Sequence, residues 1–226
     1  MSHSQGFKFK FSPMTSDKNL KYWNQKGPEK NFNNPNLILQ NPQLLKVTDR
    51  ILDVGCGYGR TLIELKLAGF ENIFGVDYSP EMILAASSKP ELSDVNLTVS
   101  VADKLPFADN SFDAVLLFAV LNCLPEIDLE VAAIKEAKRV VKKSGYVCIN
   151  DFLASESLLS ENSKRIDRYG ASALILIEDQ CLMRHTTTER AEAMTFGTKI
   201  IDWKVRNEIS MNGNPVQILS YILKKT

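Results

Sequence analysis

One decapeptide, residues 51–60 with the sequence ILDVGCGYGR, constrains the fold of this chain more than any other stretch. Ile51 to Val54 has the apolar run of a buried strand, and Tyr58 to Ala68 has the pattern of the helix that leaves it. The three alternate glycines predict a turn without side-chain bulk, which lets a ligand approach bare backbone. The helix start would offer its N–H groups and positive dipole to a carboxylate or a phosphate.

The spacing of these glycines separates two classes of nucleotide-binding protein. A dinucleotide site needs the pattern G-x-G-x-x-G, whereas here Gly59 comes one residue early and Arg60 takes the place of the expected glycine or alanine. This spacing disfavours a pyrophosphate site and, with it, an NAD-dependent oxidoreductase. With Asp53 ahead of the turn, the run D-x-G-x-G-x-G resembles motif I of the class I S-adenosylmethionine (SAM)-dependent methyltransferases, in particular their type 11/25-like domains.

The overall composition predicts one soluble α/β domain. At 226 residues the chain is long enough for one well-filled core, and no break in composition suggests a second. Its 27 basic and 27 acidic residues cancel, so global electrostatics predict neither a nucleic-acid nor a membrane partner. Four widely spaced cysteines without a C-x-x-C pattern are typical of reduced thiols in the cytoplasm. No apolar run has the length of a signal-peptide core or a membrane span.

Strand–helix alternation begins at Arg50 and predicts an α/β fold with a parallel sheet covered on both faces. Strands are expected at 51–54, 72–76, 97–102, 112–120 and 146–150, and helices at 58–68, 80–88 and about 129–142, the last terminated by Gly145. Two β-rich runs, 199–210 and 215–224, flank an Asn-Gly pair and predict a closing hairpin. In the methyltransferases that this chain resembles, such elements form a Rossmann-like, seven-stranded, mostly parallel sheet of order 3-2-1-4-5-7-6 with the last strand antiparallel.

The remaining segments complete a single domain, residues 1–226. Residues 1–45 are expected to form an N-terminal arm and cap. Up to residue 18 this is an edge strand or a mobile arm that orders on contact with the body, and short helical pieces follow from 20 to 40. Residues 46–151 form the SAM-binding core that the resemblance implies. Residues 152–185 are a lid-like insertion, with a polar helix at 155–168 and two short strands around 178–180. Residues 186–226 supply a closing helix, capped by Thr186–Glu189, and the hairpin.

An open parallel sheet binds its ligand beyond the carboxyl ends of its strands, where the strand order reverses. The glycine turn, Asp77, Asp103 and the segment Phe118–Asn122 follow or end such strands, so we expect them to converge on one crevice. Asp77 can accept two hydrogen bonds from vicinal ribose hydroxyls. An NAD site would use the same residue. A purely structural Asp77 would cap the helix that begins at Pro80, a role that Ser79 already fills.

The resemblance assigns further contacts to the adenine. Asp103 matches the carboxylate that reads the adenine amino group in similar methyltransferases, and Leu105 would flank the ring. Tyr78 and Met82 follow where an apolar contact to the other face of the ring is useful, although core packing explains Met82 equally well.

The aromatic pair Tyr22-Trp23 stands out in a polar stretch. Such residues anchor a segment to the core more often than they contact a ligand. In similar methyltransferases, however, a segment ahead of the first strand covers the methionine end of the cofactor, which keeps Tyr22 as a candidate. The predicted cofactor-binding residues are Asp53, Gly55, Cys56, Gly57, Gly59, Asp77, Tyr78, Met82, Asp103, Lys104, Leu105, Phe118 and Tyr22.

A general base is harder to find in this sequence. Many relatives carry His or Glu near the position of Asn122 and Cys123, but a neutral amide or an unactivated thiol is a poor base. The base therefore comes from elsewhere, or none is required. His185 is the first candidate for a catalytic base, against the competing interpretation of a structural histidine. Arg168, Tyr169 and Arg184 could orient an acidic substrate.

Several motifs are absent from the sequence. It has no Asn/Asp-Pro-Pro-Tyr run, no Pro-Cys nucleophile and no basic run interleaved with aromatics, so we do not expect a nucleic-acid substrate. It has no H-E-x-x-H and no cluster of Cys and His, and Asn150-Asp151 lacks a matching acid near Asn122, so no metal is expected.

The sequence thus predicts a cytoplasmic SAM-dependent methyltransferase, monomeric or homodimeric, which methylates O, N or C of a small molecule. The alternatives are a SAM-binding module without turnover and a methyltransferase that acts on a protein. Substrate selection in such folds resides in variable segments, which are the least legible part of this sequence.

Overall fold

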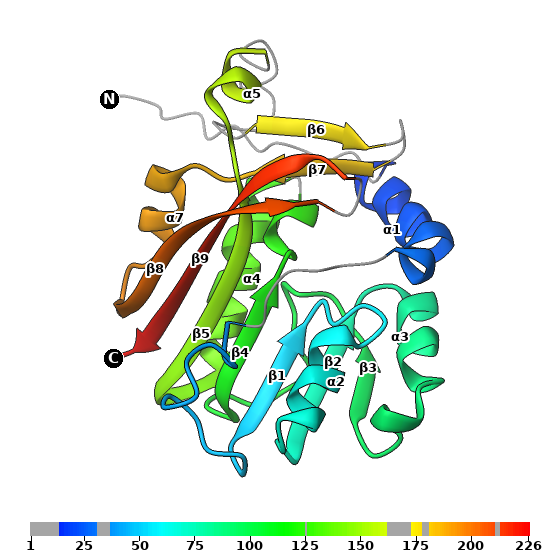
Figure 1. The fold of residues 1–226 in the computed structure, drawn as a ribbon, viewed down its shortest axis with the longest axis vertical. Coiled ribbons are helices and arrows are strands. Elements are labelled where there is room, and N and C mark those ends of the chain that lie inside the picture. The colour runs from blue at the N-terminus through cyan, green and yellow to red at the C-terminus, as the bar shows by residue number, and fades with distance from the viewer. Residues whose placement is uncertain (1–13, 31–36, 125, 162–172, 178–180, 211–212) are drawn as a thin grey trace, which may run out of the picture.

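The structure, a computed structural model, describes residues 14–30, 37–124, 126–161, 173–177, 181–210 and 213–226. Its centre is a seven-stranded sheet of order β3-β2-β1-β4-β5-β9-β8 (Figure 1). The strands are β1 (Arg50–Val54), β2 (Asn72–Asp77), β3 (Asn96–Val99), β4 (Phe112–Phe118), β5 (Val141–Leu153), β8 (Thr198–Ile209) and β9 (Pro215–Lys225). The strands from β3 to β5 are parallel, and β9 is antiparallel to β5 and β8. The predicted order 3-2-1-4-5-7-6, counted within this sheet, is confirmed.

Both faces of the sheet are buried because its strands alternate between two apolar clusters. The first cluster joins Leu52, Val54, Val115 and Leu117 of the sheet to Ala133, Ile134 and Ala137 of α4 (Ile127–Val140) and to Ala191 of α7 (Thr188–Met194). The second joins Ile51, Ile73, Ala114 and Leu116 to Leu62 and Leu65 of α2 (Arg60–Leu67), to Ala86 of α3 (Pro80–Ser87), and to Leu37 and Ile38 ahead of β1. This arrangement confirms the predicted Rossmann-like fold.

An insertion lies across the end of the sheet toward which β1 and β4 point (Figure 1). It contains α5 (Glu156–Glu161) and an antiparallel pair, β6 (Ala173–Ile177) and β7 (Cys181–His185), which form a separate two-stranded sheet. The pair is joined to the core through Thr186, whose N–H donates to the Phe152 carbonyl at 2.7 Å and whose carbonyl accepts from Ala154 N–H at 2.8 Å. The two predicted strands on either side of 178–180 are confirmed, while residues 162–168 of the predicted polar helix lie outside the described residues.

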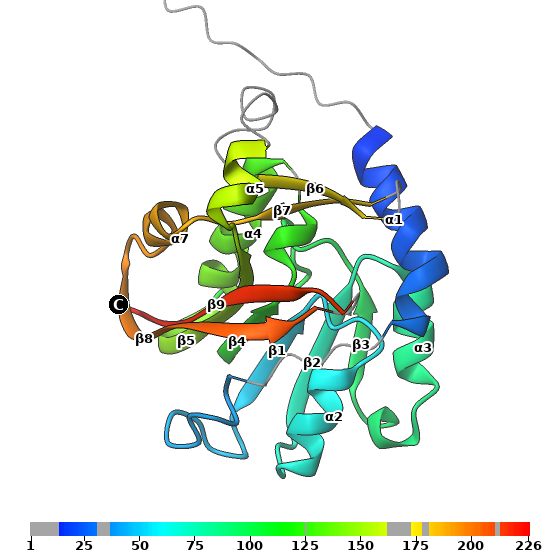
Figure 2. The same cartoon turned by 45° about the horizontal axis from the view of Figure 1, so that its top comes forward.

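Three short 3₁₀ turns lie along the chain: η1 (Gly27–Glu29), η2 (Pro90–Leu92) and η3 (Leu121–Cys123). The N-terminal helix α1 (Met14–Lys26) packs beside α3 and the β6–β7 pair (Figure 2). Asn19 fastens it: the side-chain amide donates to the Leu182 carbonyl at 2.8 Å and to the Cys123 carbonyl at 3.3 Å. Its Oδ1 accepts from Leu182 N–H at 2.9 Å. Residues 14–18 form the start of this helix, so the edge-strand alternative is wrong for them. Residues 1–13 lie outside the described part.

Two predicted helix ends are also corrected. The α4 helix ends at Val140 and not near Gly145, because the carbonyls of Arg139 and Val140 accept from Asn110 N–H and Ser111 N–H at the start of β4. Gly145 lies within β5 instead, where a Cβ would stand 2.7 Å from the Asp113 carbonyl oxygen. At α7 the N-cap is Thr187 rather than Thr186, and its hydroxyl accepts from Arg190 N–H at 3.3 Å.

Gly75 of β2 leaves room for the side chains of Leu62 on α2 and Leu97 on β3. A methyl group at this position would lie 2.8 Å from Leu62 Cδ1, 2.8 Å from Leu97 Cδ2 and 2.9 Å from Cys56 Sγ. We predict that Gly75→Ala lowers the free energy of unfolding by about 1–3 kcal/mol through overpacking, measured by urea denaturation. The double variant with Leu97→Val should lose less than the two single changes added together, because Val lacks the clashing Cδ2. A single variant as stable as the wild type would contradict this account of the contact.

Candidate functional site

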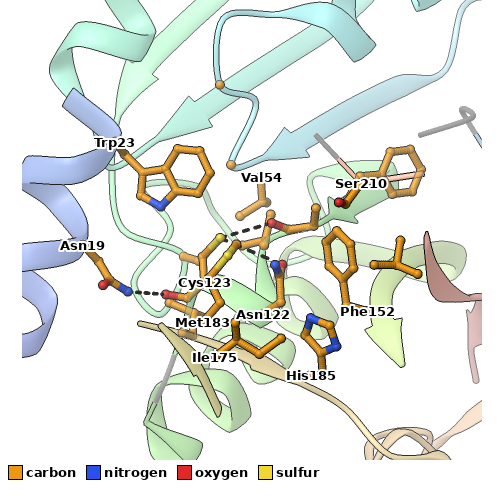
Figure 3. A pocket seen from close by; sticks show the side chains of 18 of the residues that line it. Asn19, Trp23, Val54, Asn122, Cys123, Phe152, Ile175, Met183, His185 and Ser210 are labelled. Atoms are coloured by element: carbon orange, nitrogen blue, oxygen red, sulfur yellow. Dashed lines mark hydrogen bonds between the residues drawn. The ribbon is translucent and has the colours of Figure 1, made fainter. Parts of the chain in front are cut away.

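A cavity of about 1570 Å³ opens at the carboxyl ends of the parallel strands (Figure 3). It exceeds the roughly 300–1,000 Å³ of a pocket for one small ligand, so it has room for two. One half is lined by the glycine turn and the ends of β2 and β3. The other half is lined by the end of β5, by the insertion and by the β8–β9 hairpin.

The glycine turn folds back onto the end of β2. Gly55, Gly57 and Gly59 have φ of 69°, 55° and 86°, a region that side chains rarely adopt. The N–H groups of Gly55 and Cys56 donate to the Val76 carbonyl at 2.7 and 2.9 Å. These two N–H groups are therefore bonded within the protein and are not free to bind a ligand. The donors left for a ligand are the first-turn N–H groups of α2, whose N-cap Gly59 has no capping side chain.

Asp77 ties this turn to the next helix. Its Oδ2 accepts from Gly57 N–H at 2.9 Å, and its Oδ1 accepts from Ser79 N–H at 2.9 Å. Ser79 in turn caps α3, accepting from Met82 N–H at 3.2 Å, as the sequence predicts. Burial raises the pKa of Asp77 above its usual value, and these backbone hydrogen bonds oppose the rise. A carboxylate has about four lone-pair positions, so two remain to face the cavity.

Asp53, at the end of β1, is the second buried acid in this half. Its side chain is 2 % exposed, and burial raises its pKa to about 8. Arg60 at the start of α2 acts in the opposite direction on this pKa and is itself paired with Glu64 at 2.6 Å. A cationic group of a ligand placed near Asp53 would favour the ionised carboxylate, because opposite charges stabilise each other most where water is excluded.

Ten of the predicted site residues line the cavity. They are Asp53, Gly55, Cys56, Gly57, Asp77, Tyr78, Met82, Asp103, Phe118 and His185. Asp103 arrives on a loop, since β3 already ends at Val99 and Ser100 N–H donates to the Asp77 carbonyl at 2.9 Å.

Four predicted cofactor residues do not line it. Gly59 packs on Leu92, whose Cδ1 would lie 2.3 Å from an added Cβ. Leu105 is buried in the first apolar cluster, and the neighbouring Lys104 is exposed. Tyr22 is fully buried against Trp23, with ring centroids 5.4 Å apart, and Trp23 is the member of the pair that reaches the cavity.

The half of the cavity away from the glycine turn is lined by apolar and polar side chains, the polar ones mostly from the hairpin. Phe152, Leu158, Ile175 and Met183 line it, together with Ile209 and Val216 of the hairpin. Phe152 follows Asp151 at the end of β5, so the strand-end rule could have found it. The others come from the insertion and the hairpin, whose approach to the site depends on tertiary packing and leaves no signal in the local sequence.

His185 lies at the end of β7 with its ring stacked on Phe152, at 5.2 Å between centroids and 21° between planes (Figure 3). Burial lowers its pKa to about 4. The imidazole is therefore neutral at pH 7 and retains a nitrogen that can accept a proton, although a group with this pKa is a weak base.

Neither Asn122 nor Cys123 supplies a stronger base. Burial raises the pKa of the Cys123 thiol well above its ordinary value, and its Sγ lies 3.4 Å from the Ala119 carbonyl, to which it donates. The Asn122 side chain is fully buried, and its Nδ2 has no hydrogen-bond partner. Because this nitrogen is itself buried, it is not exposed to the cavity in this structure.

Arg184 does not orient a substrate, contrary to the sequence-based suggestion. It is 1 % exposed and forms an ion pair with the equally buried Glu130, at 2.7 Å between Nη1 and Oε2. The Nη1–H groups of Arg184 do not point at the Glu130 oxygen, so this ion pair is electrostatic and not a hydrogen bond. Arg190 of α7 also pairs with Glu130. Arg168 and Tyr169, the other two candidates, lie outside the described residues.

Within the described residues, no group of three His, Cys, Asp or Glu side chains could hold a metal ion. Asp151 is 2 % exposed, and burial, with a contribution from Glu130, raises its pKa to about 8.

Over the described residues, no helix combines the length and the apolar character that a membrane span requires.

The low pKa of His185 predicts a specific pH dependence of stability. Between pH 6.5 and 4 the unfolded chain binds a proton at this residue that the folded chain does not, so folding stability is lost as the pH falls through this window. The loss is at most about 3 kcal/mol. In urea denaturation from pH 7.5 to 4, the free energy of unfolding of the wild type minus that of His185→Phe should fall by up to this amount. The titration of all other groups cancels in this difference. Parallel stability curves for the two proteins would contradict the assignment.

Part of this chain is similar to known methyltransferases. Residues 52–149 match the family model described as a methyltransferase domain. An uncharacterized methyltransferase of Schizosaccharomyces pombe is 34% identical over 148 residues, covering 57% of this chain and 52% of that protein. The 27-O-demethylrifamycin SV methyltransferase of Amycolatopsis mediterranei is 28% identical over 139 residues, covering 59% of this chain and 50% of that protein. The chain thus spans about half the length of these curated relatives.

Among solved structures, a SAM-dependent methyltransferase from Methanosarcina mazei aligns with a TM-score of 0.75 and 24% identity, over 85% of this chain and 99% of that chain. This likeness shows the fold. Together with the family-model match, it shows that residues 52–149 are similar to a methyltransferase domain and that the chain has the fold of the SAM-dependent methyltransferase from Methanosarcina mazei.

Proposed function

We propose that this chain is an enzyme that transfers the methyl group of SAM to an oxygen, nitrogen or carbon atom of a small-molecule acceptor. The observation that carries the proposal is the division of one cavity into two unlike halves. The half beside the glycine turn holds buried carboxylates and bare backbone, whereas the half beside the insertion and the hairpin combines apolar side chains such as Phe152 with polar ones such as Asn207. Such an arrangement suits a polar cofactor and a second, less polar ligand facing each other.

The residues of the first half fit SAM. Asp77 has free lone pairs for the two ribose hydroxyls, and Asp103 stands on the next loop to accept from the adenine amino group. Gly57 leaves open the space that a Cβ would take, 3.3 Å from Met82 Cε. The first-turn N–H groups of α2 face this half with the positive end of the helix dipole, which suits the carboxylate of the methionine part.

The chemistry asks mainly for positioning. SAM supplies an electrophilic methyl group on a sulfonium, so the protein has to hold the acceptor atom in line at near-attack distance and exclude water. Phe152, Ile175 and Met183 form the dry wall that does this. Where the acceptor must also lose a proton, His185 is the described residue that can accept it, as a neutral imidazole at the cavity wall.

A small-molecule acceptor is favoured by the position of the insertion. The β6–β7 pair and α1 lie over the open end of the sheet and contribute Ile175, Met183 and Asn19 to the cavity wall (Figures 1 and 2). One of the relatives is named for a small molecule, 27-O-demethylrifamycin SV.

The cysteines Cys56, Cys148 and Cys181 are buried free thiols, which fits the reducing cytoplasm in which we propose that the protein works.

The ribose contact can be tested at Asp77. Asp77→Asn keeps the shape of the side chain but removes its charge, so we expect the Kd for S-adenosylhomocysteine to rise by about 10- to 100-fold, as for one or two lost charge-assisted hydrogen bonds. Isothermal titration calorimetry measures this. Asp94→Asn is the matched control, because that exposed carboxylate pairs with Lys66 at 2.7 Å far from the turn. Equal affinity of the Asp77 variant and the wild type would refute the assignment.

The cofactor itself is tested by a thermal-shift titration with S-adenosylhomocysteine beside NAD⁺. A ligand present at 100 times its Kd that binds only the native state stabilises it by about 2.7 kcal/mol. For a chain of this length that corresponds to an increase in Tm of roughly 5–10 °C. We expect the increase with S-adenosylhomocysteine alone. An increase with NAD⁺ alone would overturn the proposal, and transfer of label from methyl-labelled SAM would distinguish an enzyme from a binding module.

A further inference from the structure

Asn19 of α1 is a buried polar residue whose side chain bonds to backbone 163 positions further along the chain. It is 2 % exposed. Its Oδ1 accepts from Leu182 N–H at 2.9 Å, and its Nδ2 donates to the Leu182 carbonyl at 2.8 Å. The same Nδ2 donates to the Cys123 carbonyl of η3 at 3.3 Å (Figure 3). One side chain therefore joins α1, β7 and η3.

The two bonds to Leu182 take the place of a third strand beside β7. Residues of an antiparallel pair direct their N–H and C=O groups alternately toward the partner strand and away from it. Those of Leu182 meet Asn19, so they point away from β6, toward the outer edge of the pair. A two-stranded sheet is only marginally stable on its own in water. Asn19 thus supplies the hydrogen bonds that this edge would otherwise lack.

The other end of α1 is held against the half of the cavity beside the glycine turn. Asn24 Oδ1 accepts from the Ser79 hydroxyl at 2.6 Å, and Ser79 N–H in turn donates to Asp77. At Gly27, directly after the helix, the chain lies so close to Met82 that an added Cβ would stand 2.7 Å from Met82 Cε. The helix therefore connects the segments around Asp77 to the insertion.

The wall of the acceptor half includes two residues of β7, Met183 and His185. The end of β7 at His185 is tied to the core by the hydrogen bonds of Thr186. The opposite end is tied by Asn19, which binds the residue next to Met183. Met183 also packs in one apolar cluster with Trp23 of α1. The place of Met183 in the cavity wall thus depends on α1.

We infer that Asn19 is a positioning residue for methyl transfer. By holding Leu182, it fixes the distance between Met183 in the acceptor half and the cofactor half, to which α1 is also bound. This inference rests on the proposed function, since it takes the half beside the insertion as the acceptor site. In-line transfer tolerates little displacement, because a shift of about 1 Å can cost on the order of 100-fold in rate. An insertion released at this end would leave the cofactor bound and the acceptor poorly held.

The test uses Asn19→Leu, which keeps the size of the side chain and removes its hydrogen bonds. Gln25→Ala, an amide on the exposed side of the same helix, is the matched control. With methionine methyl groups labelled with carbon-13, the NMR signal of Met183, assigned through Met183→Leu, reports on the acceptor half. The probe is indole, a neutral planar molecule that suits the apolar side chains of Phe152 and Ile175. Calorimetry measures the binding of S-adenosylhomocysteine separately.

In the wild type and in Gln25→Ala, we expect indole to shift the Met183 signal. In Asn19→Leu the Kd for indole should rise about tenfold or more, while the Kd for S-adenosylhomocysteine changes by less than about threefold. Hydrogen exchange of Leu182 N–H should be about 100-fold faster in Asn19→Leu, because its bond is lost.

Three results would overturn the inference. The first is a Met183 signal that does not respond to indole in the wild type, and the second is equal affinity of the wild type and Asn19→Leu for indole. The third is an equal loss of affinity for indole and for S-adenosylhomocysteine, because Asn19 would then support the whole site and not the acceptor half. The melting temperature shows whether each variant is folded.

If Asn19→Leu does not fold, two other measurements decide the question. Asn19→Asp keeps an oxygen that accepts from Leu182 N–H and should weaken indole binding less than complete loss of the amide. In the wild type, Leu182 N–H should be protected from exchange by the bond to Asn19. A Leu182 N–H that exchanges as fast as in an open chain would refute the role of Asn19.

The measurements also separate failure of this inference from failure of the proposed function. A selective loss of indole binding in Asn19→Leu, without any response of the wild type to S-adenosylhomocysteine, would keep the role of Asn19 in shaping the cavity and refute the cofactor. Binding of S-adenosylhomocysteine with unchanged indole affinity in Asn19→Leu would do the reverse.

Discussion

The carboxylate of Asp77 holds together the segments that form the half of the cavity beside the glycine turn, where we propose that the cofactor binds. It accepts from Gly57 N–H on one side and from Ser79 N–H on the other, so the turn after β1 and the start of α3 take their positions from one side chain. Burial disfavours its charged form, and the two backbone donors offset part of that cost. A ligand that donates to the remaining lone pairs would offset more, which is why a strained glycine turn and a buried acid occur together at this edge.

The acceptor half depends on a second buried cluster. Glu130 of α4 pairs with Arg184 of β7 and with Arg190 of α7, which joins the insertion and the closing helix to the core. Removing one partner of such a cluster leaves an uncompensated buried charge, typically costing about 3–5 kcal/mol. Because Arg184 precedes His185 directly, this cluster also sets where the histidine ring meets Phe152. The arginine that could have bound an acidic substrate is therefore part of the scaffold.

The two halves differ in how readily the sequence predicts them. Glycine spacing, a strand-end aspartate and a helix cap are local signals, because each requires only a few adjacent residues in a particular backbone conformation. For this reason Asp53, Gly57, Asp77 and Asp103 could be assigned to one crevice from the chain alone, and all four line it. Leu105 was misplaced because an apolar residue beside a binding loop packs equally well inward, where its N–H reaches Glu136 at 2.8 Å.

The sequence by itself thus determined the order of the sheet and the glycine turn at the cavity, and it carries the resemblance to methyltransferases, since periodicity and short motifs encode these locally. Only the tertiary structure decided what faces the acceptor. Trp23 rather than Tyr22 reaches the cavity because of the rotation of α1, fastened by Asn19. Such placements result from contacts between residues more than a hundred positions apart, and no local pattern in the chain records them.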